Sequence, residues 1–310
     1  MTPDLPTVTV VICAHTLDRL DDLRAAVASV NGQRCRPEEL LVVIDHNDEL
    51  LARAADLDAA VMANTGPKGL SGARNTGTAA ATGDVIAYLD DDAVADERWL
   101  ERLIDPFTDS AVAVVGGWAD PVWDAGPPGW FPAEFSWVIG CSHRGLPRRR
   151  SEVRNVIGCN MAFRASVIDR VGGFEVGLGR TADRPLGCEE TELCIRIRQH
   201  DPSAVILLEP DARVRHRVPP ARGTWRYYLR RCRAEGNSKA HVATLVGSND
   251  GLSSERDYVR SVLPRAVGRA LVDLPRAPVD NGGRVAAIIG GLAATSGGYL
   301  EHALRARIRR

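Results

Sequence analysis

The stretch VIAYLDDDA, residues 85–93, decides the fold that we expect for this chain. Its first five residues are those of a buried strand, and Asp90, Asp91 and Asp92 follow at once. In an open α/β sheet, ligands bind beyond the carboxyl ends of the strands. Because adjacent carboxylates repel one another, the triplet indicates a bound divalent cation such as Mg²⁺ or Mn²⁺. The alternative is a solvated acidic turn that caps the next helix.

Strand and helix patterns alternate on both sides of this stretch. Short apolar runs predict strands at 8–13, 39–45, 59–64, 84–90 and 112–117. Apolar residues at helical spacing predict helices at 20–30, 50–55, 70–81 and 96–105. This alternation implies an α/β fold with a mostly parallel central sheet and helices on both faces.

The regular pattern stops near Trp118. Residues 118–150 hold four of the six tryptophans and are predicted to form a long irregular region. Within it, Trp137 either stacks on a sugar or belongs to a hydrophobic core. Beyond it we predict a strand and a helix within 160–174, a helix after Glu189 and a strand at 204–209. From Ala221 the chain is predicted to be mainly helical, which suggests domains at 1–220 and 221–310.

The composition excludes several classes of protein. The 310 residues carry a net charge of −1, so a globally basic nucleic-acid binder is excluded. With 45% hydrophobic and 25% charged residues the chain is expected to be globular. No secretory signal and no membrane-spanning apolar run is apparent. The seven cysteines form no Cys-x-x-Cys pair, as in reduced cytosolic proteins.

Three further segments suggest chemistry, each with a structural alternative. The turn GLSGARN, 69–75, opens a helix where backbone amides favour anions, or else it is a close-packed helix start. The acids of GCEETEL, 187–193, supply a general base or a metal neighbour, or else they complement the helix dipole. Residues 213–233 contain eight arginines and no acid, which suits a diphosphate or lipid phosphate, or else a solvated helix face.

In this order, the segments resemble the inverting family 2 glycosyltransferases of the GT-A fold. The resemblance covers about residues 7–217 and is carried by VTVVICAHTLDRL, VVIDHNDE, GLSGARNTG, VIAYLDDDA, GCNMAFR, VGGFE and GCEETELCIRIR. It implies the nucleotide-diphospho-sugar transferase fold, followed here by a helical carboxyl-terminal extension. Two departures leave the nucleotide base undecided: the first strand ends Cys-Ala-His-Thr where many relatives have Pro-x-Tyr-Asn, and His46 replaces a second aspartate.

The resemblance also implies roles for single residues. Glu190 becomes the catalytic base, and a register shifted by one would move that role to Glu189. The other residues are Ala14, His15, Asp45, Arg74, Asp90 and Asp91 for the nucleotide-sugar, Asp92 and His216 for the metal, and Asn160, Glu189 and Trp137 for the acceptor region.

The implied activity is a hexosyltransferase-type reaction that uses a divalent cation, either Mg²⁺ or Mn²⁺. The expected partners are a nucleotide-diphospho-sugar donor and a glycan, lipid-linked or small-molecule acceptor, with a place in cell-envelope polysaccharide synthesis. A sugar-phosphate nucleotidyltransferase is one alternative, but it should carry a glycine-rich turn where this chain has Ala14-His15-Thr16-Leu17. A non-catalytic nucleotide-sugar binding protein is the other, although such a protein has no need of Glu190.

The expected location is cytoplasmic. Residues 285–300 are apolar and small, and the basic segment Arg305–Arg310 follows them. Such a segment either lies on the inner face of an anionic membrane or packs on the protein as a helix with a solvated tail.

Overall fold

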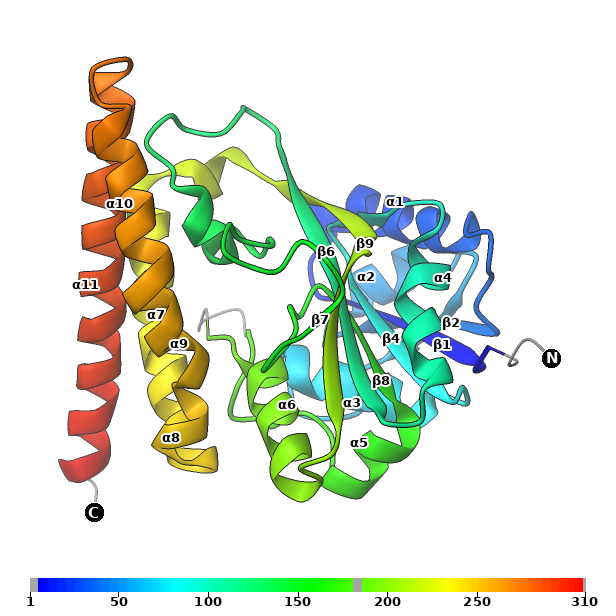
Figure 1. Ribbon diagram of the computed structural model, residues 1–310. Coiled ribbons are helices and arrows are strands. Elements are labelled where there is room, and N and C mark those ends of the chain that lie inside the picture. Colours follow the sequence, from blue (N-terminus) through cyan, green and yellow to red (C-terminus); the bar gives the residue numbers. More distant parts are fainter. Residues whose placement is uncertain (1–4, 181–185, 309–310) are drawn as a thin grey trace. The chain divides into compact units, whose positions relative to one another are not determined.

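The computed structural model describes residues 5–180 and 186–308, and its chain packs as two compact units (Figure 1). The first unit comprises Met1–Asp120, Pro147–Arg184 and Glu189–His216, and the second comprises Pro121–Leu146, Pro185–Cys188 and Arg217–Arg310. Each unit is described by itself. The division into domains at 1–220 and 221–310 stays a prediction.

A mixed sheet forms the centre of the first unit. Within the described residues its strand order is β3-β2-β1-β4-β8-β6-β9-β5, and β7 pairs with β9. The strands are β1 (Val8–Ala14), β2 (Glu39–Ile44), β3 (Ala60–Ala63), β4 (Val85–Asp90), β5 (Ala93–Ala95), β6 (Val112–Trp123), β7 (Ser151–Glu152), β8 (Asn160–Arg164) and β9 (Val205–Val218). The pairs among β1, β2, β3 and β4 are parallel, whereas β8 runs antiparallel to β4 and β6.

Helices cover both faces of this sheet. On one face are α1 (Leu20–Asn31), α2 (Asp48–Arg53) and α4 (Trp99–Ile104), and on the other are α3 (Leu70–Ala80), α5 (Ala165–Val171) and α6 (Glu189–His200). Successive residues of β1 alternate between the two cores: Val10 and Ile12 pack with the first set and Val11 with the second. The expected α/β class is therefore confirmed.

The sheet differs from the sequence prediction in its second half. The strands predicted at 112–117 and 204–209 are too short, because β6 and β9 continue to Trp123 and Val218. Beyond Glu209, buried and exposed residues alternate along β9, a pattern of half-exposed antiparallel strands that a search for apolar runs overlooks. The strands β5 and β7 have three and two residues, which is too short for an alternation of apolar and polar residues to be recognised in the sequence. The predicted irregular region also contains the 3₁₀ helix Ala133–Ile139.

The second unit is mainly helical, which confirms the expected helical extension. Its helices are α7 (Trp225–Val246), α8 (Ser248–Gly251), α9 (Ser253–Asp257), α10 (Leu263–Val272) and α11 (Pro278–Ile308). Glycine lets α11 approach α7 closely, since a Cβ on Gly298 would lie 2.0 Å from the carbonyl oxygen of Arg233. The Tyr228 hydroxyl of α7 donates to the carbonyl of Ala287 at 2.8 Å. None of the helices within 5–180 and 186–308 is long and apolar enough to cross a membrane.

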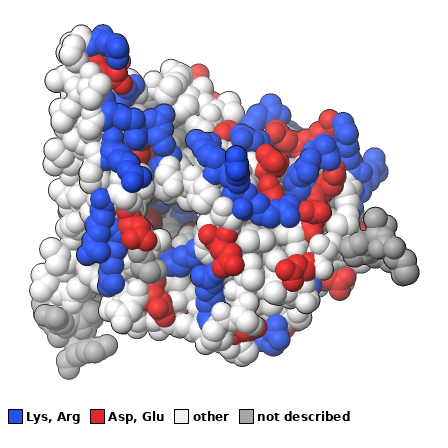
Figure 2. Space-filling model, in the orientation of Figure 1, with Lys and Arg blue, Asp and Glu red and all other residues white. Residues whose placement is uncertain are grey.

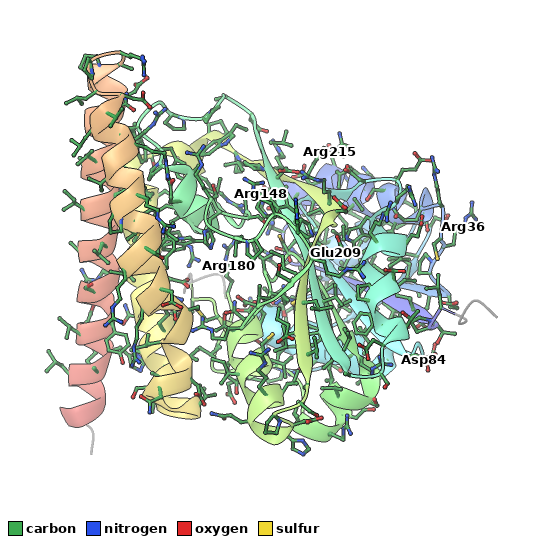
Figure 3. All side chains as sticks on the ribbon, in the orientation of Figure 1. Arg36, Asp84, Arg148, Arg180, Glu209 and Arg215 are labelled. Atoms are coloured by element: carbon green, nitrogen blue, oxygen red, sulfur yellow. The ribbon has the colours of Figure 1, made fainter. Side chains whose placement is uncertain are left out.

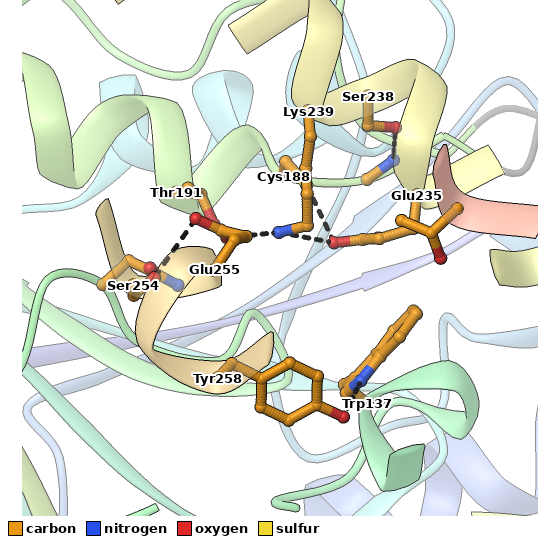
Figure 4. A network of polar contacts seen from close by, with 12 residues as sticks. Trp137, Cys188, Thr191, Glu235, Ser238, Lys239, Ser254, Glu255 and Tyr258 are labelled. Carbon is orange, nitrogen blue, oxygen red and sulfur yellow. Dashed lines mark hydrogen bonds and ion pairs between the residues drawn. The ribbon is translucent and has the colours of Figure 1, made fainter. Parts of the chain in front are cut away.

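A polar network ties the elements of the second unit together (Figure 4). The Lys239 ammonium lies 3.2 Å from Glu235 and 2.6 Å from Glu255, so it bridges α7 and α9. The Cys188 thiol donates to Glu235 at 3.2 Å. Trp137 belongs to this unit, where its indole N–H donates to the Tyr258 hydroxyl at 3.3 Å.

Candidate active site

The three aspartates lie where β4 ends. Asp90 is the last residue of β4, and Asp91 and Asp92 form the turn into β5. Because β5 pairs with β9 in the register Ala93↔His216, the imidazole of His216 reaches the second carboxylate of that turn. His216 Nε2 lies 3.2 Å from Asp92 Oδ1, and both side chains are buried. One donor atom from each of Asp90, Asp92 and His216 falls within 4.8 Å of the other two.

This cluster fits a divalent cation. Carboxylate oxygens and an imidazole nitrogen suit Mg²⁺ or Mn²⁺. Asp91 Oδ2 is buried and has no hydrogen-bonding partner among the residues that the structure describes. Burial, more than the neighbouring carboxylates, raises the pKa of Asp91 to about 8. Asp91 lies beside the cluster, and a cation bound there would favour the charged form of this carboxyl group.

Arg19 contacts the same aspartates and was not among the predicted site residues. Its Nη1 lies 2.8 Å from Asp91 Oδ1 and 2.9 Å from Asp92 Oδ2. Burial alone would lower the pKa of this guanidinium, but the carboxylates raise it. The sequence did contain a signal for Arg19 as a site residue, because Arg19 follows β1 closely. Since β1 pairs with β4 in parallel, both strands end at the same edge of the sheet, where the aspartates lie.

Arg74 of α3, whose role toward the donor stays a prediction, is held in a fixed position by several contacts. Its side chain is 2% exposed, and its Nη1 donates to Glu189 Oε1 at 2.6 Å. Its Nη2 donates to the Gly158 carbonyl at 2.8 Å and contacts Asp90 Oδ1 at 3.3 Å. The pKa of Arg74 is raised because Glu189 and Asp90 outweigh its burial. This side chain links α3, α6 and the end of β4.

The packing alternative explains most of the small residues at the start of α3. Gly69 has φ +125°, a conformation that favours glycine, and its amide donates to Asp45 Oδ2 at 2.9 Å. The amide of Leu70 donates to the backbone carbonyl of Arg180, which is labelled in Figure 3. A Cβ on Gly72 would lie 1.8 Å from the carbonyl oxygen of Pro67. The backbone amides of Gly69 and Leu70, at the start of the helix, are therefore already hydrogen-bonded within the protein.

Asp45 fixes this turn. Besides the Gly69 amide, it accepts a hydrogen bond from Asn64 Nδ2 at 2.7 Å, and His46 Nδ1 lies 2.9 Å from its Oδ1. Ala14, at the end of β1, accepts from the Asp45 amide at 2.8 Å. The exposed His15 comes next, and its ring lies 3.4 Å from Arg19 Nη2. Four of the residues predicted for the nucleotide therefore share one sheet edge: Ala14, His15, Asp45 and Asp90.

The acids at the start of α6 differ in their surroundings. Glu189 is buried against Arg74, and its Oε2 has no hydrogen-bonding partner among residues 5–180 and 186–308. Glu192 is held by Arg196 through two contacts of 2.7 Å. Glu190 is half-exposed and accepts a hydrogen bond from the Thr191 hydroxyl at 3.3 Å. Of the three, Glu190 is the one whose side chain is not buried.

Two residues predicted for the acceptor region have structural contacts. Asn160 of β8 is fully buried, and its amide donates to the carbonyls of Trp118 and Ala212 at 3.2 and 2.9 Å. Its Oδ1 accepts from the indole of Trp99 at 2.8 Å. Trp137 belongs to the second unit. Their placement near an acceptor stays a prediction.

The arginine-rich stretch is largely neutralised by acids. Arg213 contacts Asp120 at 2.7 Å, and Arg215, labelled in Figure 3, lies 3.6 Å from Asp96. In the second unit Arg217 contacts Asp124, Arg231 contacts Glu235 and Arg233 contacts Glu301. The sequence run is therefore not a single patch of positive charge.

Known proteins are similar to this chain in sequence. The family described as "Glycosyl transferase family 2" matches residues 9–172, which include Arg74 and all three aspartates. The glucosyl-dolichyl phosphate glucuronosyltransferase of Haloferax volcanii is 37% identical over 238 residues, which are 75% of this chain and 76% of the relative.

Solved structures of similar fold include two glycosyltransferases with bound nucleotides. The mannosyltransferase PcManGT from Pyrobaculum calidifontis, in complex with GDP-Man and Mn²⁺, has a TM-score of 0.57 at 17% identity, over 94% of this chain and 87% of that chain. GalNAc-T7 with UDP, GalNAc and Mn²⁺ has a TM-score of 0.51 at 21% identity, over 69% of this chain and 43% of that chain. At these identities the likeness shows the fold, and the expected GT-A fold is confirmed.

Proposed function

Since this chain belongs to glycosyl transferase family 2, we propose that it moves a sugar from a nucleotide-diphospho-sugar to an acceptor hydroxyl with inversion at the anomeric carbon. The observation that carries this proposal is the cluster of Asp90, Asp92 and His216 beside the buried pair of Arg74 and Glu189. The cluster lies at the carboxyl end of β4, the edge at which ligands of such sheets bind.

Asp92 and His216 are the proposed metal ligands, with Asp90 as the third member of the cluster. A bound Mg²⁺ or Mn²⁺ neutralises the charge that grows on the departing nucleoside diphosphate. Asp45 and His15, at the ends of β2 and β1, are the proposed contacts of the nucleoside. Arg74 faces the donor and keeps Asp90 and Glu189 in position through its contacts of 3.3 and 2.6 Å.

Glu190 is the proposed base, and its surroundings support this choice over Glu189. Glu189 is buried and its Oε1 is held by the Arg74 guanidinium at 2.6 Å, so an acceptor hydroxyl has little access to it. Glu190 is half-exposed, so an acceptor hydroxyl can reach it. It takes the hydroxyl proton while the acceptor oxygen bonds to the anomeric carbon. The bond from that carbon to the diphosphate breaks, and the diphosphate leaves with the electron pair.

A lipid-linked glycosyl acceptor is the class that we favour. The support is the relative from Haloferax volcanii, whose name gives a glucosyl-dolichyl phosphate as its substrate and glucuronosyl as the group transferred. A phosphopolyprenol that carries a sugar is therefore the acceptor to test, with hexose and hexuronate donors. Such an acceptor lies in a membrane, and we propose that the reaction takes place at the cytoplasmic face, in the assembly of a cell-envelope glycan.

The outward face of α11 is the surface that we propose for peripheral contact with that membrane. The inward face packs on α7, as one reading of the sequence expects, but Ile289, Leu300 and Leu304 remain 60%, 60% and 58% exposed. Figure 2 shows that α11 presents few charged atoms between its ends. Residues 225–310 contain fifteen Lys and Arg but seven Asp and Glu, so an anionic bilayer suits this part of the chain.

A donor panel tests the proposed reaction. The protein is incubated with Mn²⁺, one of several UDP- or GDP-sugars, and a glycosyl phosphopolyprenol, and nucleoside diphosphate release is measured. We expect one donor to give release that requires both metal and acceptor. Release should be lost in Glu190→Gln and kept in Glu49→Gln, a matched change at an exposed acid of α2. Formation of nucleoside triphosphate and sugar phosphate, or binding of every donor without turnover, would contradict the proposal.

A further inference from the structure

Arg19 occupies the place where a metal and a diphosphate are expected to meet. Its Nη1 contacts Asp91 and Asp92 at 2.8 and 2.9 Å, and Asp92 is one of the three potential metal ligands. We propose that the guanidinium of Arg19 stays paired with these aspartates when no metal is bound and transfers to the diphosphate of the donor when metal and nucleotide bind together. This inference rests on the proposed function and adds to it a second substrate-binding arginine.

The surroundings of the two guanidiniums distinguish a mobile group from a fixed one. Arg74 is 2% exposed and bonds to groups of three separate segments, so any movement would leave buried acceptors unsatisfied. Arg19 has a side chain that is 24% exposed, and its guanidinium contacts only the turn 91–92 and His15 among the described residues. It can therefore leave the aspartates without opening the core.

Asp92 cannot bind a metal ion and keep its ion pair with Arg19 without a cost in free energy. Its Oδ2 accepts from Arg19 at 2.9 Å, and its Oδ1 lies 3.2 Å from His216 Nε2. A divalent cation that binds Asp92 has to share this carboxylate with the guanidinium or replace it, and the two positive charges repel each other. Without a nucleotide, the ion pair of Arg19 therefore weakens metal binding.

A nucleoside diphosphate removes this conflict. Mg²⁺ and Mn²⁺ sites typically join one or two carboxylates to the phosphates of a substrate. The phosphate oxygens then lie close to Asp92, and a guanidinium that has just left this carboxylate finds a new anionic acceptor that it can bind through two N–H groups. Arg19 thus opposes the metal alone and favours the metal together with the nucleotide, which makes their binding cooperative.

Mn²⁺ titrations followed by electron paramagnetic resonance test this inference without any turnover. The Kd of Mn²⁺ is measured with and without saturating UDP, and with GDP in a parallel series, for the full chain and for Arg19→Gln. We expect Arg19→Gln to bind Mn²⁺ about tenfold more tightly when no nucleotide is present, and the improvement caused by the nucleotide to fall by a similar factor. Arg19→Lys, which keeps the charge but not the forked geometry, should lie between the two.

Arg24→Gln is the matched control. Arg24 lies on α1, where it contacts Asp21 at 3.3 Å and Asp56 at 3.8 Å, and its loss should change neither Kd. A Kd of Mn²⁺ that is unchanged or weaker in Arg19→Gln would overturn the inference. An equal gain with and without nucleotide would do so too, because it would show a general effect of charge. If the unaltered chain binds no Mn²⁺ in either state, the proposed metal site itself fails, and the inference fails with it.

Discussion

Replacing Arg74 by methionine should destabilise the first unit through the acid that it leaves behind. Methionine has a similar length and fills the space, but it donates no hydrogen bond. Glu189 would then lose its 2.6 Å partner while its second oxygen is already without a hydrogen bond within the described residues. The carbonyl of Gly158 would lose its 2.8 Å donor as well.

The size of the effect follows from these losses. Removing one partner of a buried ion pair costs about 3–5 kcal/mol, because the other charge remains buried. Replacing Glu189 by glutamine as well, in Arg74→Met/Glu189→Gln, should recover most of this free energy. The buried group is then a neutral amide, which costs far less to bury than a charge. The double variant should therefore be more stable than Arg74→Met alone.

Buried cysteines of the first unit report this stability locally. Cys194 of α6 and Cys159, next to Gly158, are buried, and burial raises the pKa of the Cys194 thiol to about 12. Labelling by a thiol reagent followed by peptide mapping measures how often each thiol is exposed. A loss of 3 kcal/mol should accelerate labelling about 150-fold, at a factor of ten for each 1.4 kcal/mol. A change below about threefold, or no recovery in the double variant, would refute the reasoning.

Three other variants test separate parts of the site and surface. Asp92→Asn should abolish Mn²⁺-dependent binding of UDP or GDP in calorimetry, and binding like that of the unaltered chain would remove Asp92 from the metal site. Glu190→Gln should lower kcat by about 10²-fold or more while nucleotide binding survives; an active Glu190→Gln beside an inactive Glu189→Gln would move the base by one residue. Ile289→Glu with Leu300→Glu should reduce co-sedimentation with anionic vesicles at unchanged helix content by circular dichroism, and undiminished binding would exclude the outward face of α11.

The first half of the fold could be predicted because its signals are local. Each parallel strand is a continuous apolar run, and the aspartates follow β4 directly in the sequence. The ends of neighbouring parallel strands share one edge, which is why the triplet at 90–92 pointed to a ligand site, whereas Asp45 and His15 were assigned to it through the family resemblance. Antiparallel β9 has one half-exposed face, and its alternating pattern beyond Glu209 was missed for that reason.

The pairings across the site could not be predicted in the same way. The register of β5 on β9 brings His216 to Asp92, and the sequence alone suggested this histidine only through a family resemblance. The pair of Arg74 and Glu189 joins residues that are 115 positions apart. Arg19 contacts aspartates that follow it by 72 and 73 positions. Contacts of this kind depend on how strands and helices are arranged in space, and the spacing of apolar residues along the sequence does not indicate them.

The products of a single reaction test the central claim most directly. The full chain is incubated with Mn²⁺, the donor that releases nucleoside diphosphate and a glycosyl phosphopolyprenol, and the mixture is followed by ³¹P and ¹H nuclear magnetic resonance. The account predicts nucleoside diphosphate as the phosphorus-containing product released from the donor, and a new glycosidic bond whose anomeric configuration is opposite to that of the donor. A retained configuration, or a nucleoside triphosphate formed together with a sugar phosphate, would contradict it.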